Sequence, residues 1–212
     1  MTDIVYALME SLRAHLQSKL VTSPPSWIQE VLTIPVGGTP TYIPPTFIKV
    51  GRVYDPIDDG VPGRGLPFVQ IAIHANDPDD LSDRWEHAIL SAIPFSRENT
   101  GIGMGYPFEI GGGQFWWRRL TVKFIVDATE ADLNQVAAGR LANSLRSVLE
   151  RLCNSRSQSN ADGWLPGSAA EPGGETPILS QVAKSHCWEG GGPDDDFIWR
   201  GGVWVQVLTE KP

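Results

Sequence analysis

The sequence predicts an α+β fold, in which helices pack on one face of an antiparallel β-sheet. Two segments, at 2–20 and 129–152, repeat apolar residues with helical spacing, and several others alternate apolar and polar residues as strands do. The order is helix, strands, helix and strands, with no internal repeat. The 212 residues are expected to form one domain, 1–212, with extended loops at about 36–65, 94–113 and 154–177.

The first 20 residues predict an amphipathic helix with a cap at Thr2 or Asp3. Its apolar positions recur at intervals of three and four: Val5, Leu8, Leu12, Leu16 and Leu20. The prolines at Pro24 and Pro25 end it, because the residue before a proline avoids the helical conformation. Residues 27–32 continue as a short apolar segment whose secondary structure the pattern does not decide. Residues 37–45 are expected to be a loop rich in Gly, Pro and Thr.

Several strands follow this loop. Residues 47–54 and 67–74 alternate and stop at turn residues, and 84–93 fits a strand or a helix, with strand preferred. Residues 108–110 and 114–127 flank the run of glycines at 111–113 and are expected to form a hairpin.

The segment 114–127 is the most regular strand of the chain. Its apolar set is expected on the core side: Leu120, Val122, Phe124 and Val126. The intervening Thr121 and Lys123 are expected to point to water.

The second helix spans 129–152 and begins with a capping-box pattern in which Asp132 replaces the usual Glu. Its apolar stripe, which includes Leu141, Leu145 and Leu149, should pack on the sheet. Two strands, 178–188 and 197–208, close the chain and are joined across an acidic, glycine-rich turn.

Composition excludes several classes of function. The net charge of −8 disfavours a protein that binds duplex DNA, which needs a basic face. No apolar run approaches the roughly 20 residues that span a bilayer, and the first residues lack the pattern of a signal peptide. Two cysteines, Cys153 and Cys187, are expected to be reduced thiols. The eight tryptophans must be buried in the core or against a partner.

Motifs of catalysis are not found. The sequence has no Gly-x-Ser-x-Gly elbow, P-loop or His-Glu-x-x-His motif, and the glycines at 101, 103 and 105 indicate a flexible loop. His186 and Cys187, near the aspartates at 194–196, are the best metal candidates, but neighbours on a strand point to opposite faces. His74, close to Asp77, is expected to be a surface residue. We therefore expect no catalytic residue, no metal and no cofactor.

The clearest candidate for an interaction site is the run Trp116, Trp117, Arg118 and Arg119. On a strand, one tryptophan enters the core and the other faces outward with its flanking arginine. Exposed aromatic and arginine side chains are typical of interface hot spots. The complementary patch is expected in the acidic turn: Asp194, Asp195 and Asp196. The alternative is a tryptophan covered by its own subunit.

A family resemblance rests on element order. The first helix is followed by the strand 118–127, the motif Ala131-Asp132-Leu133, the leucine-rich helix, and a late strand over 197–207. This pattern resembles a tail terminator, or tail-completion protein, of a tailed bacteriophage. It covers 1–20, about 66–74, 115–152 and 197–208, around half the chain. The loops are longer than those of a minimal terminator. Two related roles therefore remain as alternatives: a head–tail connector subunit and the terminator of a contractile tail.

The resemblance implies a structural subunit of the virion, made in the host cytoplasm, that forms a ring, commonly a hexamer. Its partners would be copies of itself, the tail tube protein and the head-side connector, with DNA passing through the bore and no membrane contact. Two alternatives from other classes are a small hydrolase with its site near His74 or His186, and a monomeric binding module with an aromatic surface.

Overall fold

The computed structural model describes residues 4–45, 48–50, 68–73, 108–110, 113–127, 135–169, 174, 176–189 and 198–211. Its helices are α1 (Ile4–Gln17), α2 (Ser26–Val31) and α5 (Gln135–Cys153), with a π-helical turn η1 (Ser18–Thr22) and a 3-10 turn η4 (Pro166–Ala169). The predicted α+β fold is confirmed.

The described main sheet has the strand order β3-β4-β6-β8-β7, with β5 paired to one end of β6. β3 runs parallel to β4, and the other pairs are antiparallel. The bounds are β3 (Ile48–Val50), β4 (Phe68–Ile73), β5 (Phe108–Ile110), β6 (Gly113–Asp127), β7 (Thr176–Glu189) and β8 (Ile198–Lys211). β4, β6, β8 and the β5–β6 hairpin thus occupy segments predicted to be strands.

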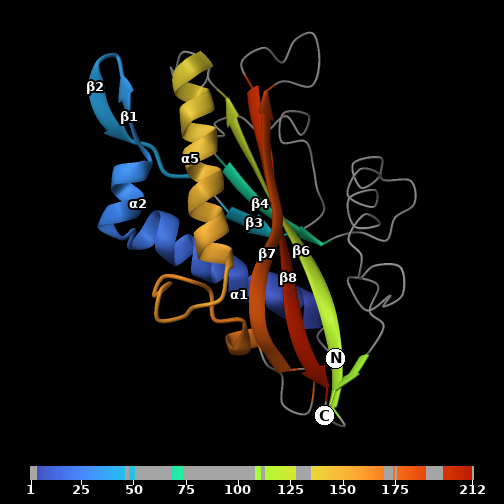
Figure 1. Ribbon diagram of the computed structural model, residues 1–212. Coiled ribbons are helices and arrows are strands. Elements are labelled where there is room, and N and C mark those ends of the chain that lie inside the picture. Colours follow the sequence, from blue (N-terminus) through green and yellow to red (C-terminus); the bar gives the residue numbers. More distant parts are fainter. Residues whose placement is uncertain are drawn as a thin grey trace.

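The helices α1 and α5 cover one face of this sheet (Figure 1). α5 packs against β6, β7 and β8, and α1 packs against β3 and β4. The side chains predicted for the core are at most 1% exposed: Leu120, Val122, Phe124, Val126, Leu141, Leu145 and Leu149. They join α1 leucines such as Leu12 in one apolar cluster, so the expected packing of the long helix on the sheet is confirmed.

Thr121 corrects the expectation that the second face of β6 is solvated at this point. Its exposed fraction is 2%, and its partner across the ladder is Trp204, which is 6% exposed. The Trp204 ring extends along β8 toward Gly202, where a Cβ atom would lie 3.0 Å from the ring. A large cross-strand neighbour therefore buries the hydroxyl-bearing residue, whereas Lys123 is half-buried.

The first predicted helix is divided in two. α1 ends at Gln17, and η1 continues the chain to Ser23, whose N–H donates to the Ser18 carbonyl at 2.8 Å. Pro25 then precedes α2. The apolar segment 27–32, whose secondary structure the sequence pattern did not decide, is therefore largely helical. The helical segment that begins with α1 and continues through η1 ends at Thr22, just before the two prolines, as expected.

The segment 37–45, expected to be a loop, contains part of a β-hairpin. Strands β1 (Thr33–Val36) and β2 (Thr39–Tyr42) pair across a two-residue turn. Gly37 and Gly38 have φ of 56° and 86°, the positive values that this tight turn requires and that glycine adopts without steric cost. We call residues 33–42 the arm; Figure 1 shows it standing apart from the main sheet, beside α5.

The described parts of the other predicted loops also carry some structure. β5 lies inside 94–113, and 154–177 contains η4, two isolated bridges and the start of β7. The loop after α5 caps one stretch of β7: Ser155 N–H donates to the Ser180 carbonyl, and Val182 N–H donates to Asn154 Oδ1, each at 2.9 Å. Two irregularities interrupt the β7 register. The hydrogen bonds from the loop and the irregularities in register both protect β7, an edge strand, from pairing with another chain.

Both cysteines are free thiols, as predicted. Cys153 is fully buried, and burial raises its pKa above the usual range of a thiol. Cys187 is half-buried, and burial raises its pKa to about 11. Neither thiol is therefore a ready nucleophile at neutral pH.

Candidate interaction surfaces

The predicted aromatic–arginine site lies in the first half of β6. Trp116 pairs with Thr209, Trp117 with Leu208 and Arg119 with Gln206, and Arg118 is half-buried opposite the buried Val207. The predicted acidic partners, Asp194, Asp195 and Asp196, lie outside the described residues. The structure thus gives the register of the first patch and leaves its pairing with the second as a prediction.

The metal candidates separate as strand geometry requires. His186 is exposed on β7, whereas its neighbour Cys187 packs against the apolar cluster on the helix-covered face. Within the described ranges, no three His, Cys, Asp or Glu side chains lie together in a way that could hold a metal ion. His74, Asp77 and the glycines at 101, 103 and 105 fall outside those ranges.

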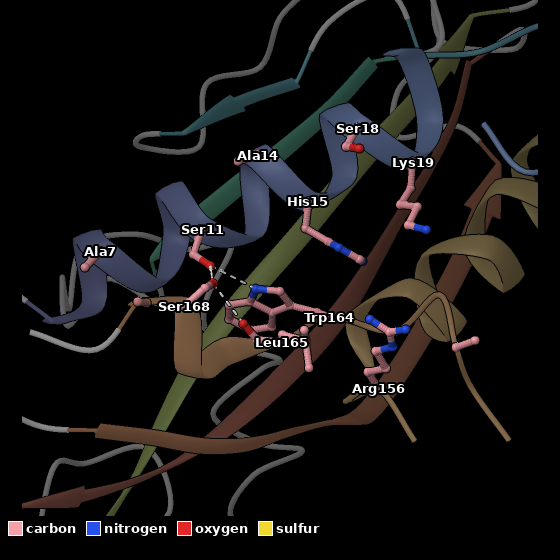
Figure 2. Close-up of a pocket in the computed structure, with 13 residues that line it drawn as sticks. Ala7, Ser11, Ala14, His15, Ser18, Lys19, Arg156, Trp164, Leu165 and Ser168 are labelled. Atoms are coloured by element: carbon pink, nitrogen blue, oxygen red, sulfur yellow. Dashed lines mark hydrogen bonds between the residues drawn. The ribbon is translucent and has the colours of Figure 1, made fainter. Parts of the chain in front are cut away.

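A pocket that sequence reasoning missed lies between α1 and the segment 154–169. It has a volume of about 740 Å³. Figure 2 shows the polar residues of α1 lined up along one wall, opposite Trp164 and Ser168. The Ser11 and Ser168 hydroxyls are 2.6 Å apart, and the Trp164 indole N–H donates to Ser11 Oγ at 3.1 Å. These hydroxyls therefore tie η4 and the loop to α1.

His15, in the same pocket, is neutral at neutral pH. Burial, the larger cause, and the positive charge of Lys19 together lower its pKa to about 4. The carbonyls of Leu152 and Asp162 favour the protonated ring but are outweighed. Its Nε2 atom is buried and has no hydrogen-bond partner among the described residues.

The ion pair at the rim of the pocket is part of a structural clamp. Asp162 accepts from Lys19 Nζ and from the Trp27 indole N–H, each at 2.8 Å, and these hydrogen bonds lower the pKa of its carboxyl group. The Arg151 guanidinium lies 4.1 Å from the centre of the Trp27 ring. The clamp joins η1, α2, α5 and the loop that follows α5. Its members are distant in sequence, so no local pattern could reveal it.

A second hollow, which we call the arm groove, lies between the arm and the N-terminal half of α5. Its volume is about 620 Å³, and its walls include Val31, Pro35, Val136 and Trp199. Val136 is 66% exposed and Val31 is 39% exposed. The Trp199 ring covers Gly139, where a Cβ atom would lie 2.7 Å from it, and its indole N–H has no acceptor among the described residues.

The arm carries no charged residue. No Asp, Glu, Lys, Arg or His occurs between residues 31 and 48, although the chain has 42 acidic and basic residues in total, 25 plus 17. Arg140, which is exposed on α5, is the charged residue in the lining of the groove. Depletion of charge at an exposed, partly apolar surface is a compositional signature of protein interfaces.

No protein-family model and no curated protein matches this chain significantly. Among the helices of the described residues, none is both long enough and apolar enough to cross a membrane.

Proposed function

We propose that this chain is a structural subunit of a bacteriophage neck or tail, a ring-forming tail terminator that caps the tail tube and joins it to the head-side connector. The observation that carries the proposal is the element order: an N-terminal helix, an antiparallel sheet, one long helix on that sheet, and the late strand β8 between β6 and β7. This is the order on which the sequence resemblance depends.

The surfaces are consistent with an assembly subunit. An exposed arm with apolar residues at its base suits a protein that meets neighbours of defined shape. By contrast, the polar side chains in and at the rim of the pocket between α1 and the segment 154–169 hold the fold together: Ser11, Lys19 and Asp162. No described contact favours the hydrolase alternative.

The proposed partners are further copies of the chain, the tail tube protein and the head-side connector protein. DNA would pass through the bore of the ring, and the net charge of −8 would keep the phosphate backbone from adhering to it. The proposed location is therefore the neck or tail of the virion.

Native mass spectrometry of the purified chain, with negative-stain images of the same sample, tests this proposal. A hexamer would weigh about 139 kDa, six times 23.2 kDa, and would be seen as a ring. Rings should also bind the end of tail tubes assembled without a terminator. A chain that stays monomeric at every concentration and does not bind such tubes would contradict the proposal.

A further inference from the structure

We propose that the arm of one copy docks in the arm groove of the next copy, and that this head-to-tail contact closes the ring. The inference rests on the proposed function, because it names the contact by which the ring subunits associate. Its occupant is a second copy of this chain.

The arm is held by its own subunit at the base and exposed at the tip. Ile34, which is 5% exposed, packs with Val36 and Tyr42 on the apolar cluster, whereas Pro35 and the residues from Gly37 to Thr41 are exposed. β1 and β2 pair only with each other among the described strands. Two-stranded hairpins are marginally stable on their own in water, so packing against a neighbour would stabilise the arm.

Two prolines determine which hydrogen-bonding groups the edges of the arm present to a neighbour. Pro35 and Pro40 pair across the arm, one position away from the residues that flank the turn. At this non-hydrogen-bonded position of a two-residue hairpin, backbone groups point outward on both edges. Proline supplies a carbonyl there but no N–H. Both edges therefore resist extension as a sheet and offer hydrogen-bond acceptors.

The groove is complementary to this acceptor-rich, uncharged arm. Arg140 supplies a cationic donor at the exposed side of the groove. Val31 and Val136 supply exposed apolar area. The subunit's own arm forms one wall of the groove through Thr33, Ile34 and Pro35, so a different arm must fill it.

The lack of charge on the arm suits a second copy better than a partner of opposite charge. A basic protein would be drawn to the acidic surfaces of a chain with net charge −8. Two copies of this chain repel each other, and the uncharged region 31–48 is where they can meet without burying like charges. An arm in a groove is also a heterologous contact, the type that generates rings.

Two variants and a matched control test the contact. Val136→Lys places an ammonium group in the groove, and Thr39→Lys places one on the exposed tip of the arm. Each should weaken association at least about a hundredfold, because a buried cation beside Arg140 has no partner of opposite charge. The control Val21→Lys, at an exposed valine outside the groove, should assemble as wild type does.

Mixing the two variants gives the decisive result. Val136→Lys keeps a working arm and Thr39→Lys keeps a working groove, so the mixture should form one-to-one heterodimers that cannot close a ring. Circular dichroism and denaturant unfolding should match wild type in all three variants. Wild-type rings that persist in both variants would overturn this contact and leave the proposed function intact. A wild-type chain that never forms rings would overturn both.

Discussion

At the scale of single residues, His15 links burial to the dependence of stability on pH. Its pKa in the folded chain is about 4, against 6.5 for an unperturbed histidine. Between these values the unfolded state binds more protons, so stability is greatest above about pH 6.5 and falls as the pH decreases toward 4. The loss is at most ~3 kcal/mol, and partial exposure of the ring reduces it.

We predict that His15→Gln flattens the pH dependence of the unfolding free energy between about pH 4.5 and 7, measured by denaturant titration. Ser18→Ala, which changes a residue of the same pocket that does not titrate, should keep the wild-type slope. Asp162 affects stability in a different pH range. Because its pKa is lowered, its carboxylate loses its stabilising interactions only at pH values below the usual range of a carboxylate. An unchanged slope in His15→Gln would show that this imidazole is not the group responsible.

Leu145 tests the core at the same scale. It is fully buried in α5, so Leu145→Ala should lower the free energy of unfolding by about 2–5 kcal/mol through lost apolar burial and a cavity. Ser147→Ala, at an exposed position of the same helix, should stay within about 0.5 kcal/mol of wild type. Equal effects of the two changes in denaturant unfolding would contradict the packing of α5 on the sheet.

At the scale of elements, the contact between β6 and β8 depends on a glycine. Phe124 faces Gly201 across the ladder, and a Cβ atom at Gly201 would lie 2.8 Å from the His186 carbonyl oxygen and closer still to the Phe124 ring. The aromatic ring therefore occupies the space that a side chain on β8 would need.

We predict that Gly201→Ala destabilises the fold by about 1–3 kcal/mol, because it overpacks the sheet. Gly167→Ala is the control, since its nearest neighbour would be an ordinary contact 3.6 Å away. Combining Gly201→Ala with Phe124→Leu should cost less than the sum of the two single changes, a coupling that a double-mutant cycle in thermal or denaturant unfolding measures. Strict additivity would argue against this close approach.

At the scale of the whole molecule, ionic strength separates the two proposed ring contacts. Copies with a net charge of −8 repel each other, and salt screens this repulsion. A contact through the uncharged arm should therefore hold or strengthen as NaCl rises from about 0.05 to 0.5 M. A contact between Arg118 or Arg119 and Asp194 to Asp196 should weaken over the same range.

Sedimentation velocity across this salt series measures the association constant. We expect no loss of association, in agreement with the arm contact. A tenfold or greater loss would favour the arginine–aspartate contact instead, and Trp117→Ala combined with Arg119→Glu should then shift rings to monomers while the fold stays intact by circular dichroism.

The sequence by itself determined the elements whose periodicity is long. The apolar alternation of 114–127 and the stripe of α5 identified the strand, the helix and the core residues from Leu120 to Leu149, because burial on one face imposes a period on the chain. The hairpin of β5 and β6 followed from the glycines between two apolar segments.

Only the tertiary structure decided the arm, the burial of Thr121 and the two hollows. A hairpin rich in Thr, Pro and Gly resembles a loop in composition, and only its pairing distinguishes it from one. Thr121 is buried by Trp204, which lies 83 positions further along the chain. The clamp on Asp162 joins residues that are 135 and 143 positions away. Such contacts depend on how elements meet in space, which no local pattern of residues encodes.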